Sequence, residues 1–125
     1  MSDLAIDVTV TPEYRAEESN EADSRYVFSY TINVRNDSPH SVQLMDRYWK
    51  ITQGSGDYQE VRGKGVVGQQ PLIGPGQQFR YTSRAMLQTP VGVMEGVYTL
   101  LDTSTQRVFE VAIPAFRLAV PYQLH

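Results

Sequence analysis

Residues 26–35 read Tyr-Val-Phe-Ser-Tyr-Thr-Ile-Asn-Val-Arg, and this stretch shows the pattern that decides the fold. Large apolar or aromatic side chains occupy every second position from Tyr26 to Val34. Successive side chains of a β-strand point to opposite faces, so a period of two predicts a strand with one buried and one wet face, with Ser29 on the wet one. The same alternation over residues 4–11 predicts a second such strand.

The rest of the chain consists of short alternating segments that are separated by turn residues such as 36–40 and 54–57. No stretch keeps a helical period for more than a turn, and we count seven or eight strands. In the third, the apolar positions change phase between Leu44 and Trp49, which predicts a β-bulge near Met45 and Asp46. Trp49 then faces inward, as the core tryptophan of an immunoglobulin-like domain does. We predict an all-β, antiparallel β-sandwich.

Two strand boundaries are further expectations. Tyr58 to Val61 predicts a short polar strand at a sheet edge. Arg107 to Ile113 predicts the last strand, and the tail 114–121 is expected to be extended but broken off by the prolines at both of its ends.

The 125 residues suit one domain, 1–125, with one core. The chain contains no cysteine, which excludes disulfides, thiolate metal sites and cysteine nucleophiles. It has no apolar run near the ~20 residues of a membrane span and no basic-then-apolar leader, so we expect a cytoplasmic protein without membrane contact. Residues 1–25 carry seven acids and two bases, including an acidic loop at 16–24, and the remainder is only mildly basic. This balance argues against nucleic-acid binding.

The glycine-rich segment 62–76 contains Gly63, Gly65 and Gly68 at the spacing of dinucleotide-binding loops. That motif requires a helix to begin after the third glycine, with its N-terminus facing the phosphates. Pro71 and the sequence Gly-Pro-Gly at 74–76 prevent such a helix. The segment therefore predicts a glycine-rich turn between strands.

An alternative use of this segment is to hold an anion. Consecutive backbone N–H groups in a glycine-rich loop can bind phosphate without a helix. Arg62 and Lys64 flank the glycines, and Arg80 and Arg84 lie on a strand that could neighbour them. The anion-binding candidates are Arg62, Gly63, Lys64, Gly65 and Gly68, for a phosphate, a pyrophosphate or a nucleotide phosphate.

The sequence gives little support for a metal site or a catalytic site. His40 with Asp37 and Asp46 is a poor set of metal ligands, Asp37 is better explained as an Asx-turn residue, and the second histidine is His125. A serine or threonine nucleophile needs a positioned base, which only these histidines could supply. We predict no metal site, no cofactor, no catalytic residue and no enzyme activity.

Several motifs resemble the bacterial ApaG family, also called CorD. They cover residues 25–31, 42–49, 63–71, 75–83, 89–90 and 113–118, which span nearly the whole chain. One departure is Arg84, where the family usually has glycine. The resemblance implies a fibronectin type III-like or immunoglobulin-like sandwich and an association with cobalt and magnesium tolerance or efflux. The same domain occurs in eukaryotic F-box proteins and in a DNA polymerase delta-interacting protein, where it looks like a protein-interaction module.

From residues and resemblance together we predict a non-catalytic binding protein, monomeric or homodimeric, for an unidentified protein partner. The alternative is a binder of a phosphate-containing small molecule. Tyr48, Tyr58 and Tyr122 are the candidate surface aromatics, because most other tyrosines alternate with core positions. No catalytic residues are established for the family.

Overall fold

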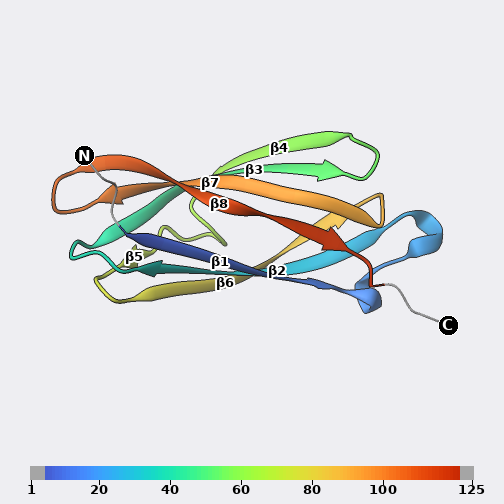
Figure 1. The fold of residues 1–125 in the computed structure, drawn as a ribbon, viewed down its shortest axis with the longest axis horizontal. Helices are drawn as coiled ribbons and strands as arrows, with labels where there is room; N and C mark the ends of the chain where they lie inside the picture. Colours follow the sequence, from blue (N-terminus) through green and yellow to red (C-terminus); the bar gives the residue numbers. More distant parts are fainter. Residues whose placement is uncertain (1–4, 122–125) are drawn as a thin grey trace.

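A computed structural model describes residues 5–121, which form eight β-strands and two short 3-10 turns (Figure 1). The strands are β1 (Ile6–Tyr14), β2 (Tyr26–Asn36), β3 (Val42–Gln53), β4 (Tyr58–Lys64), β5 (Leu72–Ile73), β6 (Gln78–Leu87), β7 (Val91–Asp102) and β8 (Arg107–Ala119). The 3-10 turns are η1 (Ala16–Glu18) and η2 (Glu21–Asp23). All strand pairs are antiparallel, which confirms the predicted fold class.

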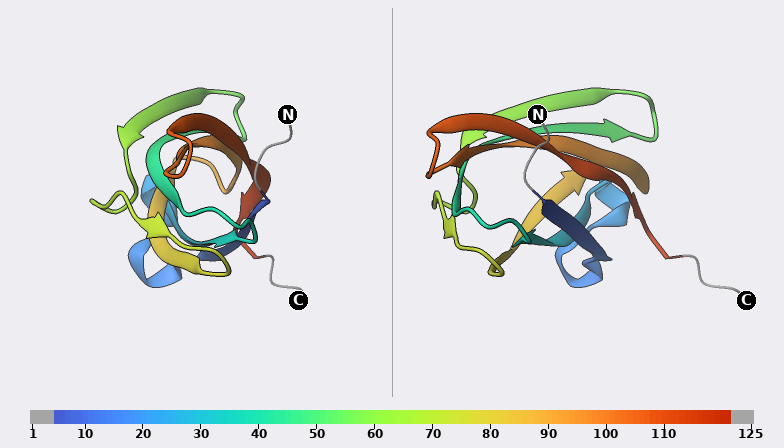
Figure 2. Two further views of the ribbon diagram at one scale, coloured as in Figure 1. Left: turned by 90° about the vertical axis from the view of Figure 1, so that its left-hand side faces the viewer. Right: turned by 60° about the vertical axis from the view of Figure 1, so that its left-hand side comes forward.

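The strands form two layers. The small sheet has the order β1-β2-β6, and the large sheet has the order β4-β3-β7-β8 with β5 paired to β3. On one side of the sandwich β1 packs against β8, which closes that side. On the other side lie β4 and β6, each of which pairs along one edge only within the described part of the chain (Figure 2). The sandwich therefore has a closed side and an open side.

The bulge predicted in the third strand is confirmed. The β3–β7 register shifts between Leu44 and Asp46, so β3 changes phase at Met45. Leu44 and Trp49 both face the core, at 0% and 3% exposure, although they are five positions apart and a regular strand would place them on opposite faces. The bulge thus lets one strand bury residues of both parities.

The predicted end of the last strand is wrong, because β8 continues through Pro114 to Ala119. The β7–β8 register passes from Gly96–Ile113 to Met94–Phe116, so Pro114 and Ala115 together face Glu95. A bulge leaves one residue out of the ladder, and proline has no N–H to contribute there. Because of the bulge, β8 continues through a proline that would interrupt a regular hydrogen-bonded ladder.

The core lies between the two sheets. Tyr30 and Phe116 contact Trp49 with ring centroids 5.5 Å and 5.9 Å away. Tyr81 and Tyr98 are also buried, and their hydroxyls are hydrogen-bonded to each other in the interior. Burial in so apolar a place favours the neutral phenol and raises the pKa of both tyrosines.

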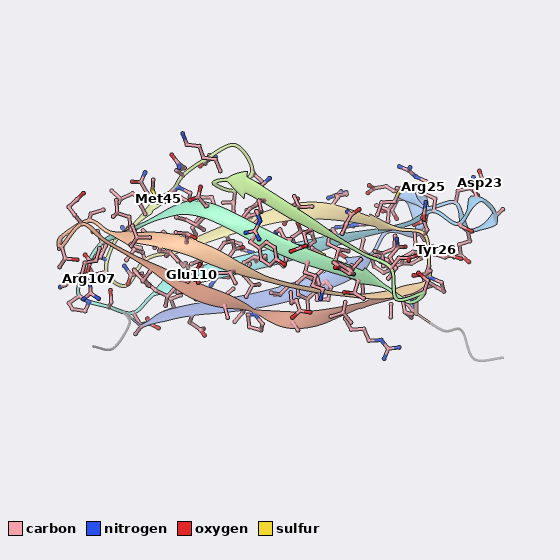
Figure 3. The ribbon with its side chains drawn as sticks, turned by 90° about the horizontal axis from the view of Figure 1, so that it is seen from above. Asp23, Arg25, Tyr26, Met45, Arg107 and Glu110 are labelled. Carbon is pink, nitrogen blue, oxygen red and sulfur yellow. The ribbon has the colours of Figure 1, made fainter. Side chains whose placement is uncertain are left out.

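The acidic loop covers part of the small sheet instead of hanging free. The side chain of Arg15 donates to Ser29 Oγ at 3.0 Å, and Ser19 Oγ accepts the Val27 N–H at 2.8 Å. Ser29, predicted on the wet face, is consequently only 2% exposed. Asp23 and Arg25 lie at the end of the molecule opposite Arg107 (Figure 3).

Both helical elements of residues 5–121 have three residues, far short of a membrane crossing.

Candidate functional site

The glycine-rich segment begins as the end of β4 and then makes a tight turn. Arg62, Gly63 and Lys64 pair with β3, and residues 66–69 form a two-residue hairpin turn. Both central residues of this turn have positive φ, Val67 at 42° and Gly68 at 78°. As predicted, no helix follows the third glycine within residues 5–121. The turn is shorter than the predicted segment 62–76, because residues 62–64 continue β4 and residues 72–73 form β5.

Several backbone amides of this turn already donate to carbonyl oxygens of the protein. Gly65 N–H donates to the Met45 carbonyl at 2.7 Å, and Val66 and Gln69 exchange two backbone bonds of 2.8 Å. Arg62 lies over the ring of Tyr48, 4.4 Å from its centroid. Anion binding by this segment stays a prediction, for which calorimetric titration with pyrophosphate on wild type and Lys64→Ala is the measurement.

The two further arginines proposed beside the glycines belong to the other sheet. Arg80 and Arg84 lie on β6, opposite Asn33 and Ser29 of β2. Arg84 Nε donates to Glu18 Oε1 at 2.9 Å, so it pairs with the acidic loop. Position 84 is a regular strand position, so the arginine that departs from the pattern implied by the resemblance meets no tight turn there.

Arg47 is the cation that sequence reasoning missed. It follows the bulge with the parity of Trp49, so its side chain points into the sandwich and is half-buried. Its Nη1 donates to the carbonyl oxygens of Lys64 and Gly65 at 3.3 Å and 2.9 Å. Gly63 faces Arg47 across the ladder, and a β-carbon there would lie 2.6 Å from Nη1. The first glycine of the motif therefore makes room for a guanidinium.

Arg47 borders a cleft of about 390 Å³ on the open side of the sandwich, between β3–β4 and β6. We call it the edge cleft and define it by six of its lining residues, Arg47, Trp49, Gln59, Val61, Ser83 and Met86. Trp49 and Val61 supply apolar surface, while Gln59 and Ser83 supply polar groups. The cleft thus combines an aromatic wall, a cation and two neighbouring strand edges.

The charge of Arg47 acts on the phenols around it. Burial raises the pKa of Tyr30, whereas its hydrogen bond with Ser83 and the Arg47 charge lower it. The same charge opposes the rise in the pKa of Tyr81 and Tyr98. Arg47 is thus close enough to these phenols for its charge to oppose part of the effect of burial on their pKa.

His40, Asp37 and Asp46, which the sequence predicts to be a poor set of metal ligands, do not converge in the structure. His40 Nδ1 lies 2.7 Å from Asp102 Oδ2, while Asp37 accepts a bond from Arg35 and Asp46 lies exposed on the outer face of β3. The Asx turn is made by Asn36, whose Oδ1 accepts the Ser38 N–H, so its assignment to Asp37 is wrong. Residues 5–121 contain no group of three or more metal-ligating side chains. His125 and Tyr122 lie outside the described residues.

His40 instead belongs to a polar network at the end of the sandwich. The Asn36 amide donates to the carbonyl oxygens of His40 and Ile73, and the Ser38 hydroxyl donates to Asn36 Oδ1. Asp102 accepts the His40 bond and the N–H of Ser104. We call Asn36, Ser38, His40 and Asp102 the end network, and its role in the fold is to tie the β2–β3 connection to β5 and β7.

Comparison with known proteins agrees with this architecture. The profile of the family described as ApaG domain matches residues 16–102. Protein ApaG of Chromohalobacter salexigens is 70% identical over the full length of both chains, and Protein ApaG of a Methylobacterium species is 53% identical over 94% of this chain and 89% of its own. A crystal structure of a Bordetella pertussis protein described as ApaA superposes with a TM-score of 0.92 at 45% identity, over 96% of this chain and 97% of that one. The chain belongs to the ApaG family.

Proposed function

We propose that this chain is a non-catalytic protein-binding module that takes an extended segment of a partner protein along β4. The observation that carries the proposal is the free edge of β4 beside the edge cleft. In an antiparallel pair, alternate residues point their N–H and C=O groups away from the partner strand. Over its seven residues β4 therefore offers a row of backbone donors and acceptors that no strand within residues 5–121 occupies.

Adding a strand to such an edge is a common mode of peptide recognition. Backbone hydrogen bonds supply affinity, and pockets for alternate side chains supply specificity. Here Gln59 and Val61 lie on the inner face of β4 and line the edge cleft. A segment added beside β4 would thus direct every second side chain toward Trp49 and Arg47. Aromatic and arginine side chains are the residues most enriched where protein interfaces bind tightly.

The family supports the same role from another direction. ApaG-like domains in larger eukaryotic proteins resemble interaction modules, and a binding role needs no catalytic residues. We propose the association with cobalt and magnesium tolerance, which the resemblance also implies, as the cellular setting of this binding role.

Photo-crosslinking in cells tests the proposal. Benzoylphenylalanine placed at Gln59, which is exposed inside the cleft, should give crosslinked partner bands. The same group at Thr82, on the exposed outer face of β6, is the matched control and should give none. Mass spectrometry of the adduct should locate the crosslink in one segment of the partner. Equal labelling from both positions, or none from Gln59, would contradict the proposal.

A further inference from the structure

We propose that Arg47 makes the edge cleft a carboxylate-recognition site, which reads an acidic side chain on the partner's extended segment. The inference rests on the proposed function, since it names the chemistry of the partner at that site. This role of Arg47 is separate from the anion binding that the sequence predicts for the glycine motif and its flanking bases, Arg62 and Lys64.

The hydrogen-bonding geometry of Arg47 leaves most of its donors available. Arginine carries five N–H donors in a fixed, planar fork. Both protein bonds of Arg47 come from Nη1, so its Nε and Nη2 have no acceptor among residues 5–121. Those two nitrogens form the edge of the guanidinium that binds a carboxylate with two parallel bonds.

The charge balance points the same way. Within the described chain the acceptors of Arg47 are two neutral carbonyl oxygens, and no carboxylate forms an ion pair with it. A half-buried cation beside the wall made by Trp49 and Tyr30 lies in a region of lowered dielectric, where an opposite charge is attracted more strongly than in water.

The other arginine at the cleft shows the contrast. Arg84 is exposed and already bound by Glu18 of the acidic loop, at 2.9 Å. Its positive charge is compensated by Glu18, whereas no carboxylate among residues 5–121 forms an ion pair with Arg47. A carboxylate that enters the cleft therefore meets Arg47 as the cation without a charged partner.

Strand geometry then fixes the spacing of the partner's side chains. Gly63 and Val61 are two residues apart on the inner face of β4, and Arg47 lies over Gly63. Side chains two apart on a strand are separated by about 6.6–6.8 Å on one face. The partner segment should carry an acidic residue opposite Gly63 and an apolar residue two positions away, opposite Val61.

Selection from a random peptide library displayed on phage tests this pattern. Wild-type protein should select peptides with an acidic and an apolar residue two positions apart. Arg47→Met should lose the acidic preference and bind the selected peptides at least about tenfold more weakly. Arg80→Met, which removes an exposed arginine from the outer face of β6, is the control and should select the same peptides as wild type.

Gly63→Ala is the second variant, because it keeps the guanidinium but places a β-carbon 2.6 Å from it. It should weaken binding of the acidic peptides more than binding of the same peptides with Asn or Gln in place of the acid. An acidic preference that survives in both Arg47→Met and Gly63→Ala, or that never appears in wild type, would overturn the inference.

A titration with sodium succinate separates this inference from the proposed function. Succinate should shift the Nε–Hε resonance of Arg47 in a nitrogen–proton NMR spectrum and leave that of Arg80 unchanged. If no peptide is selected but succinate shifts the Nε–Hε resonance of Arg47, the carboxylate site is supported and the proposed strand addition is contradicted. If peptides bind along β4 but neither succinate nor an acidic residue affects Arg47, the carboxylate site is overturned and strand addition stands.

Discussion

The end network and the edge cleft both place polar groups inside the sandwich, but they differ in how fully those groups are satisfied. In the end network, Asn36 and Asp102 are bonded from several sides and are 0% and 6% exposed. In the edge cleft, Arg47 bonds two carbonyl oxygens and has further donors without an acceptor among residues 5–121, beside an edge of β4 that no described strand pairs with. A satisfied buried network stabilises a fold, whereas an unsatisfied one is available to a ligand.

The largest expected effect is on the end network. Asn36→Ala removes the amide that donates to the carbonyl oxygens of His40 and Ile73 and the oxygen that accepts from Ser38, whose hydroxyl keeps its bond to the His40 carbonyl. We expect a loss of about 3 kcal/mol in the free energy of unfolding, measured by urea denaturation. Asn33→Ala, on the outer face of the small sheet, should cost less than about 1 kcal/mol. Similar losses at the two positions would remove the distinction between network and surface.

The second prediction concerns pH. The hydrogen bond from His40, together with the backbone bond from Ser104, lowers the pKa of Asp102 below its usual value near 3.9. A carboxyl whose pKa is lower in the folded state contributes stability above its unfolded pKa and loses it as pH falls through the folded pKa.

Asp102→Asn should therefore melt at a lower temperature than wild type at pH 7, by less than Asn36→Ala does. The gap between Asp102→Asn and wild type should shrink as pH falls below about 4. Asn36→Ala removes no titrating group, so its gap should stay nearly constant over the same range. A gap for Asp102→Asn that is unchanged from pH 7 to pH 3 would contradict the account.

The third prediction is a small effect at Arg47. Arg47→Met removes two hydrogen bonds, to the carbonyl oxygens of exposed Lys64 and buried Gly65, and a charge that has no ion-pair partner in the described chain. We expect a change of at most about 1 kcal/mol in the free energy of unfolding. A loss as large as that of Asn36→Ala, in parallel urea denaturations, would make Arg47 a structural residue and weaken its assignment to binding.

The smallest prediction lies at the turn after β4, outside both clusters. Val67 is β-branched, 51% exposed and held at φ 42°, where such side chains are strained. Asn tolerates this conformation and suits the turn. Val67→Asn should raise the free energy of unfolding by about 0.5–1 kcal/mol without changing peptide affinity. Destabilisation by this substitution would show that the valine side chain makes a contact worth more than the strain.

Sequence alone predicted the sandwich and much of its detail, because alternation and phase are local properties. The phase change around Met45 predicted the bulge, and the same parity that buries Trp49 turns Arg47 inward, where it is half-buried. An arginine at an inward position is normally excluded on hydrophobicity, and only its pairing with Gly63 shows where the guanidinium fits.

The remaining features depend on contacts between distant residues. His40 and Asp102 are 62 positions apart, so their pair has no local signal. Pro114 was expected to end a strand, since its bulge is visible only with β7 beside it. Arg62 and Lys64 drew attention as neighbours of the glycines, yet strand alternation places them on the face opposite Arg47.

The most direct test of binding at the open side is backbone amide hydrogen exchange with a selected peptide bound. The account predicts that residues 58–64 of β4 gain protection, because strand addition gives their outward N–H groups acceptors. Amides of β1 and β8, on the closed side, should exchange as in the free protein. Protection confined to β1, β8 or the outer sheet faces, with β4 unchanged, would contradict the claim.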